Sequence, residues 1–300
     1  MEYSGKLFDD ECVNIAHDTI PMPAATRNRR MSSICKTRIG ETKDMSNVEI
    51  ESSLKIEDNH LSHRPSLAVQ TFSWRKCIEI FIAEVVATSL LLCLGCMSTV
   101  VGFDGSQSVH KLQPALAFGF LVSSLITSFG HISGAHMNPA VTICFYMMGT
   151  IEAFLIPIYL AAEIIGSVLG MGLLLLVTPV GIIGSRDVCT TIPNPTLNSF
   201  QALGVEFVCT SLLLLVLLGC SDVRNADKQD SVPLKFAGVI ITLSLLGGPY
   251  TGASVNPVRS FAPALWSHNW TANWVYWVGP SLSGLITPFF YQCCFPPVRK

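Results

Sequence analysis

Two asparagine-proline pairs are the residues of this chain best suited to handle a polar solute. They stand in Asn138-Pro139-Ala140 and Asn256-Pro257-Val258, each at the start of a short apolar segment. Asparagine is a favoured helix N-cap and proline suits the first helical position, so each pair predicts a helix start. The asparagine amide also offers N–H donors to a solute. One such pair is weak evidence, because many capped helices begin this way. Only the two pairs together indicate a functional site.

Ionisable side chains also occur inside apolar segments. Arg259 directly follows the second pair, and a buried cation in a membrane segment is costly unless it faces water. Glu84 and Glu206 lie in long apolar runs, and ionisable residues there are functional candidates by default. Their matching positions instead favour a supporting role, in which each carboxyl group holds the backbone of a loop. Glu163 lies in another apolar run, and the sequence assigns it no role.

An internal repeat connects these residues. Glu84-Val-Val-Ala-Thr-Ser-Leu-Leu-Leu returns 122 residues later at Glu206 as Glu-Phe-Val-Cys-Thr-Ser-Leu-Leu-Leu. Gly134-Ala-His-Met-Asn-Pro-Ala returns 118 residues later at Gly252 as Gly-Ala-Ser-Val-Asn-Pro-Val. The two offsets agree within the variation of loop length, so the chain contains two related units.

The composition predicts an integral membrane protein. Of 300 residues, 50% are hydrophobic and only 13% are charged, which is more apolar than a soluble domain of this size requires. A soluble fold would have to bury entire runs such as 78–101 and 203–220, whereas about 20 apolar residues match the bilayer core. A net charge of −2 argues against a nucleic-acid partner.

The expected fold is all-α, with six transmembrane helices and two re-entrant half-helices in two inverted repeats. The six predicted crossings are 77–101, 110–129, 151–178, 200–220, 234–250 and 272–292. The apolar segments 137–148 and 255–266 are too short to cross, so we expect them to enter the membrane and turn back. Three crossings in each unit is an odd number, so the two units must have opposite orientations.

Basic residues predict the orientation of the chain. Arg75 and Lys76 precede the first crossing, and Arg224, Lys228 and Lys235 lie near the connection between the fourth and fifth crossings. By the positive-inside rule, both termini are cytoplasmic. The predicted organisation is a disordered tail over 1–74, a channel domain over 75–292, with repeats at about 77–178 and 200–292, and a short tail over 293–300.

Inverted repeats bring the two half-helices together N-terminus to N-terminus near the middle of the bilayer. Their positive dipole ends then converge beside Asn138 and Asn256. A neutral hydrogen-bonding solute can pass through such a site, whereas the field disfavours protons and other cations. The small residues before each pair do not form a crossing, and their carbonyl groups are tolerable only along a water-filled path.

From Trp74 to Gln292 the sequence resembles the aquaporin, or major intrinsic protein, family, which carries two Asn-Pro-Ala motifs followed by an arginine. Val258 departs from the second motif, which suggests a change in packing only. The resemblance implies an outer constriction formed here by Phe118, Ser244, Ala253 and Arg259. It also implies a homotetramer with one pore in each subunit.

The constriction residues bear on which solutes pass. Strict water channels of the family have histidine where this chain has Ser244, so Ser244 and Ala253 predict a wider opening that accepts glycerol or urea, with Phe118 on one side and Arg259 on the other. Classical glycerol channels differ from this chain at Ser260 and Ala264. The mixture resembles the insect glycerol-transporting branch. The alternatives are a strict water channel and a poorly conducting structural or adhesion member of the family.

Other classes fit less well. A secondary transporter normally coordinates a coupling ion through unwound carbonyls and intramembrane acids, and an enzyme would need a nucleophile or carboxylate near a base. We expect no cofactor and no metal. The eleven cysteines scatter, and Cys93, Cys96, Cys144, Cys209 and Cys220 lie in apolar runs where a thiol acts as a small hydrophobe, so no disulfide framework is predicted.

The remaining expectations concern single positions. His131 and His136 flank the loop before the first motif, where a structural role is favoured over gating by pH. Gly166 and Gly170 predict a close approach of two helices. Asn269 begins a glycosylation sequon, which the topology puts outside the cell. The expected location is the plasma membrane.

Overall fold

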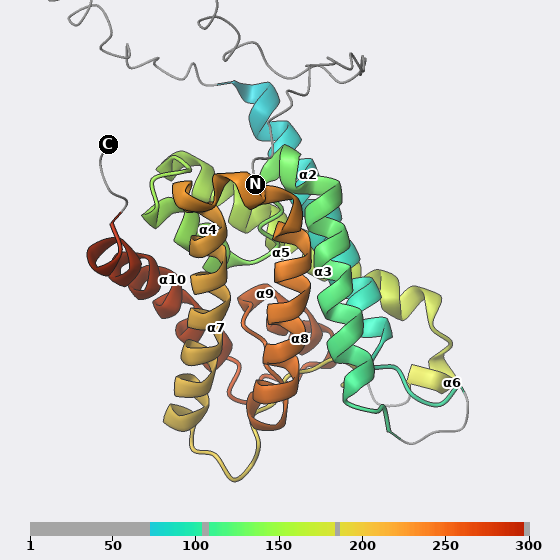
Figure 1. Ribbon diagram of the computed structural model, residues 1–300. Coiled ribbons are helices and arrows are strands. Elements are labelled where there is room, and N and C mark those ends of the chain that lie inside the picture. Colours follow the sequence, from blue (N-terminus) through green and yellow to red (C-terminus); the bar gives the residue numbers. More distant parts are fainter. Residues whose placement is uncertain (1–72, 104–107, 184–186, 297–300) are drawn as a thin grey trace, which may run out of the picture. The chain divides into compact units, whose positions relative to one another are not determined.

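The computed structural model describes residues 73–103, 108–183 and 187–296, and the regular structure within them is helical (Figure 1). The predicted N-terminal tail therefore lies almost entirely outside the described residues, as do the last residues of the C-terminal tail. Six helices are long: α2 (Trp74–Met97), α3 (Leu112–Ser133), α5 (Ile156–Val177), α7 (Ser199–Ser221), α8 (Val232–Thr251) and α10 (Val275–Cys294). The half-helices are α4 (Pro139–Met147) and α9 (Pro257–Ser267), and the connections hold η1 (Ala153–Leu155), α6 (Val180–Ile183) and η2 (Val223–Ser231). The predicted all-α fold with six long and two short helices is confirmed.

Five helical stretches are long and apolar enough to cross a membrane by length and composition, and they contain α2, α3, α5, α7 and α8. The last long helix, α10, falls short only in hydropathy, because its prolines, serines, tyrosines and glutamine lower the average. It has 20 residues and no Asp, Glu, Lys or Arg. A helix of this length spans about 30 Å, the thickness of the hydrocarbon core, so we count it as the sixth crossing.

The contacts between helices follow the internal repeat. In the first unit α2 packs against α3 and α5, and in the second α7 packs against α8 and α10 in the same way. Each half-helix packs against a long helix of the other unit, α4 on α10 and α9 on α5. The units also meet through α3 and α8, which lie side by side with α7 next to α8 (Figure 1). The main contacts between these helices thus have counterparts under exchange of the units.

Gly166 and Gly170 allow α5 to approach α2 closely. A Cβ atom on Gly166 would come within 2.5 Å of the carbonyl oxygen of Val85, and one on Gly170 would overlap the carbonyl oxygen of Ser89. Small residues four apart permit such contact between membrane helices. The close approach predicted for these glycines therefore occurs inside the bundle.

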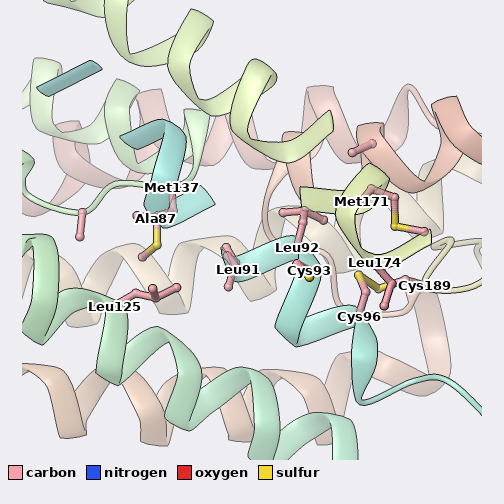
Figure 2. Packing of buried hydrophobic residues seen from close by; sticks show 12 residues of the cluster. Ala87, Leu91, Leu92, Cys93, Cys96, Leu125, Met137, Met171, Leu174 and Cys189 are labelled. Atoms are coloured by element: carbon pink, nitrogen blue, oxygen red, sulfur yellow. A yellow bond between two sulfur atoms is a disulfide. The ribbon is translucent and has the colours of Figure 1, made fainter. Parts of the chain in front are cut away.

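One expectation about the cysteines is wrong. Cys96, near the end of α2, forms a disulfide with Cys189 in the connection before α7. Figure 2 shows this bond at one end of a buried cluster that includes Leu92, Met171 and Leu174. Apolar neighbours surround a buried thiol and a buried disulfide alike, so the apolar run around Cys96 did not distinguish the two.

The close contact of α5 with α2 predicts a difference between two valine substitutions. Gly170→Val forces the helices apart and should lower stability by about 1–3 kcal/mol, the usual cost of overpacking. The matched control is Gly204→Val on α7, where nothing lies within 4 Å of the added Cβ. Thermal unfolding of both variants in detergent measures the difference, and equal midpoints would contradict the proposed packing.

Candidate functional site: a cavity between two half-helices

Two loops with the same backbone path lead into the half-helices. The first follows α3, with positive φ at Gly134 (89°), Ala135 (48°) and Met137 (50°). The second follows α8, with positive φ at Gly252 (83°), Ala253 (48°) and Val255 (49°). A non-glycine residue in this region costs on the order of 1–3 kcal/mol and persists only where its surroundings hold it in place.

The carboxylate of Glu84 on α2 holds the first loop. Its Oε1 accepts hydrogen bonds from the Ser133 hydroxyl (2.6 Å) and the backbone N–H of His136 (2.9 Å), and its Oε2 accepts from the backbone N–H of Met137 (2.8 Å). Glu84 is completely buried. Two backbone N–H groups that have no helical partner are thereby satisfied by one side chain.

Glu206 on α7 holds the second loop in the same way. Its Oε1 accepts from the Thr251 hydroxyl (2.6 Å) and the N–H of Ser254 (3.0 Å), and its Oε2 accepts from the N–H of Val255 (2.8 Å). The side chain is also completely buried. The two repeated glutamates thus make equivalent hydrogen bonds in the two units.

Each motif asparagine caps its own half-helix and contacts the opposite loop. The Oδ1 of Asn138 accepts from the N–H of Ala140 (3.0 Å), and that of Asn256 accepts from the N–H of Val258 (3.1 Å). The Nδ2 of Asn138 donates to the carbonyl of Val255 (2.9 Å), and the Nδ2 of Asn256 donates to that of Met137 (2.7 Å). An amide nitrogen has two hydrogens, so each asparagine keeps one N–H beyond this contact.

A cavity of about 930 Å³ runs past both asparagines. Its lining follows α3 from Pro114 to His131 and α8 from Val232 to Pro249, which is about 25 Å along each helix at 1.5 Å per residue. Phe118, Ser244, Ala253 and Arg259 all line it. The structure therefore brings the two motifs and the four expected constriction residues to one elongated cavity.

The arrangement of Phe118 and Arg259 differs from the expected one. The guanidinium carbon of Arg259 lies 5.2 Å from the centre of the Phe118 ring, within the range of a cation–π contact. Carbon atoms in contact lie about 3.5–4.0 Å apart, so no solute fits between the two groups. The two groups lie next to each other on the wall of the cavity.

His136 and Glu163 are buried next to the first motif, and His136 also contributes to the lining of the cavity. The His136 ring stacks on Phe145 and Tyr159, with centroid distances of 4.5 and 4.1 Å, and its Nδ1 lies 2.9 Å from the Thr142 hydroxyl. The Oε1 of Glu163 accepts from that hydroxyl (2.7 Å) and from the N–H of Asn138 (3.2 Å). Glu163 thus supports the N-terminus of α4, a role that the sequence did not assign because its partners are fixed only by the fold.

Val258 and Asn269, which the sequence analysis singled out, have clear surroundings in the fold. Val258 is fully buried with Pro139, Ala140 and Pro257, so the valine occupies a packing position. The amide of Asn269 donates to Asp187 (3.3 Å) in the connection before α7.

Sequence reasoning missed Cys189, whose backbone carbonyl accepts a hydrogen bond from Arg259 Nη1 (2.7 Å). Its position in a polar stretch between two crossings, unlike Cys93, Cys96, Cys144, Cys209 and Cys220, was the available signal.

The comparisons with known proteins agree with this geometry. The model of the family "Major intrinsic protein" matches residues 70–291. The chain belongs to the major intrinsic protein family. It is 39% identical to rabbit lens fiber major intrinsic protein over 219 residues, covering 73% of this chain and 81% of the relative. It is 34% identical to mouse aquaporin-4 over 218 residues, covering 72% of this chain and 67% of the relative.

A solved structure has the same fold. The aquaglyceroporin from Plasmodium falciparum matches with a TM-score of 0.66 at 24% identity, covering 74% of this chain and 98% of that one. The aquaporin fold, with six transmembrane helices and two re-entrant helices, therefore holds for this chain. The chain is an integral, multi-pass membrane protein of a channel family.

Replacement of either supporting glutamate by glutamine should lower both the stability and the permeability of the protein. Glu84→Gln or Glu206→Gln replaces one acceptor oxygen with a donor, so at least one loop N–H loses its partner, at a cost of about 1–3 kcal/mol. Thermal unfolding in detergent and water permeability per surface channel should both fall. Glu79→Gln, on the same helix as Glu84 but half exposed and paired with Arg75, is the matched control. Wild-type behaviour of both loop variants would refute the supporting role.

Proposed function

We propose that the protein is a passive channel for water and for small neutral solutes such as glycerol and urea, and that it excludes ions and protons. The observation that carries this proposal is the pairing of Phe118 and Arg259 at one corner of the constriction, with the small side chains of Ser244 and Ala253 also lining the cavity. Small residues leave room for a three-carbon polyol. Its hydroxyl groups meet the guanidinium, and its carbon chain meets the aromatic ring.

The two half-helices support the exclusion of cations. Asn138 and Asn256 contact each other's loops, so the N-termini of α4 and α9 lie close together. Helix N-termini carry a partial positive charge, and Arg259 adds a full charge farther along the same cavity. A cation therefore meets a positive field at two levels, whereas a neutral solute meets hydrogen-bond donors.

Two other functions within the family remain as alternatives. The Plasmodium protein is named an aquaglyceroporin, whereas the names of the rabbit and mouse relatives specify no glycerol transport, so a strict water channel is the first alternative. A poorly conducting structural or adhesion member is the second. The first would pass water without glycerol, and the second would pass neither at a useful rate.

The disulfide supports the proposed orientation. Disulfides persist on the oxidising outer side of the cell membrane, and Cys96 lies at the end of α2 opposite to Arg75 and Lys76. An outer Cys96 leaves the start of α2 on the cytoplasmic side, in agreement with the positive-inside rule. We include in the proposal cytoplasmic termini, residence in the plasma membrane and assembly as a homotetramer. Asn269 is then on the outer side, where a glycan can be attached.

Ser244→His tests the solute range of the channel. An imidazole in place of the hydroxyl narrows the opening, so uptake of labelled glycerol and urea should fall at least tenfold while osmotic swelling changes by less than threefold. Oocytes expressing the wild type and the variant provide both measurements, normalised to surface protein.

Ser244→Ala is the matched control, because it keeps the opening wide and removes only the hydroxyl. Glycerol uptake should survive in this variant. Swelling of the wild type without solute uptake would identify a strict water channel, and the absence of both would favour the structural alternative.

Arg259→Ala tests the exclusion of cations. Removal of the charge also removes part of the positive field, so proton or cation currents under voltage clamp should rise at least severalfold above those of the wild type. Arg75→Ala is the control, because this arginine is exposed at the start of α2 and forms an ion pair with Glu79. Equal currents in wild type and Arg259→Ala would show that the charge of Arg259 does not contribute to the exclusion of cations.

A further inference from the structure

The end of α2 lies against Phe118 and is linked to Arg259 through Cys189. Cys96 is bonded to Cys189, and the carbonyl oxygen of Cys189 accepts a hydrogen bond from Nη1 of Arg259 (2.7 Å). The neighbouring Gly95 lies against the ring of Phe118 so closely that a Cβ atom there would overlap the ring. Two consecutive residues of α2 are therefore connected to this corner of the constriction, Gly95 by packing against the ring and Cys96 through its bonded partner Cys189.

The segment around Cys189 is also held by α9 and by the end of α8. The Thr191 hydroxyl lies 2.6 Å from the Ser260 hydroxyl, and the N–H of Asn194 donates to the carbonyl of Tyr250 (2.7 Å). These bonds fix the chain after Cys189 relative to the second motif. The turn that contains Cys189 is closed by a hydrogen bond from the N–H of Thr190 to the carbonyl of Asp187 (3.1 Å), and the disulfide adds a covalent link from Cys189 to α2.

Cys189 adopts a backbone conformation that needs such support. Its φ is 66°, and it is 9% exposed. A non-glycine residue at positive φ tends to leave that region when nothing restrains it. A change of this torsion angle would move the carbonyl oxygen away from Arg259, and the bond to Cys96 is one of the restraints that oppose such a change.

We propose that the Cys96–Cys189 disulfide is a specificity-determining link, which keeps the Cys189 carbonyl in place as the acceptor for Arg259 and thereby sets the width of the outer constriction. This inference rests on the proposed function only in taking Arg259 as part of the constriction. Arginine has five N–H donors on a long side chain. Without a fixed acceptor the guanidinium leaves its place beside Phe118, and the discrimination between solutes by size declines.

The experiment compares ratios of permeability, which do not depend on the number of channels. Wild type, Cys96→Ser, Cys189→Ser and the double variant are expressed in oocytes, and uptake of glycerol and of the larger polyol erythritol is measured beside swelling. Cys293→Ser is the control, because Cys293 is a free, exposed thiol at the end of α10. The erythritol-to-glycerol ratio should rise at least threefold in all three disulfide variants and stay unchanged in Cys293→Ser.

A second arm avoids variants that fail to fold. Wild-type channels already at the surface are treated with a membrane-impermeant phosphine, and mass spectrometry of the recovered protein verifies reduction of the bond. The ratio should rise on reduction and return on reoxidation, with no change in the double serine variant. An unchanged ratio with a verified reduced bond would show that the disulfide only stabilises the fold, and it would overturn the proposal.

The two proposals can fail separately. A wild type that passes water but no glycerol contradicts the proposed solute range. In that case the disulfide is tested by whether its removal admits glycerol, because a freed Arg259 should widen a narrow opening as well as a wide one. Glycerol uptake that stays absent in the reduced channel would overturn the role of the disulfide.

Discussion

The need to satisfy backbone polar groups inside the membrane is the constraint on which the rest of this structure depends. A pore built from two half-helices requires two stretches of non-helical backbone at membrane depth, where an unpaired N–H is costly. Glu84 and Glu206 meet this need, since each completely buried carboxylate accepts hydrogen bonds from two loop N–H groups and one hydroxyl. The carbonyl groups of the same loops then remain available to other partners.

The motif asparagines follow from this arrangement. With the loops held by the glutamates, the carbonyls of Met137 and Val255 accept from the amides of Asn256 and Asn138, so each loop is tied to the opposite half-helix. These crossed bonds keep the two helix N-termini together and leave one N–H on each amide for a solute. The same residues therefore join the two repeats and line the cavity between them.

Much of this was predictable from the sequence, because its signals are local or repeated. The Asn-Pro pairs predicted helix starts at Pro139 and Pro257, where α4 and α9 begin, and the repeat around Glu84 and Glu206 predicted two equivalent units. Long-range details were not predictable. The pairing of Cys96 with Cys189 joins residues 93 positions apart, and the partners of Glu163 come from the half-helix it faces. Phe118 and Arg259 were expected across an opening, but their proximity depends on how the fold places α3 beside the first turn of α9.

The most direct test of this account is hydrogen exchange in the two loops, measured by mass spectrometry of the protein in lipid nanodiscs. Amide groups that line a water-filled cavity exchange quickly unless they are hydrogen-bonded. If the glutamates hold the loops, peptides covering 134–138 and 252–256 should be protected from exchange to a similar extent as the adjoining ends of α3 and α8. Exchange within seconds at the N–H groups of His136, Met137, Ser254 and Val255 would show that the glutamates do not hold the loops, and it would contradict the central claim.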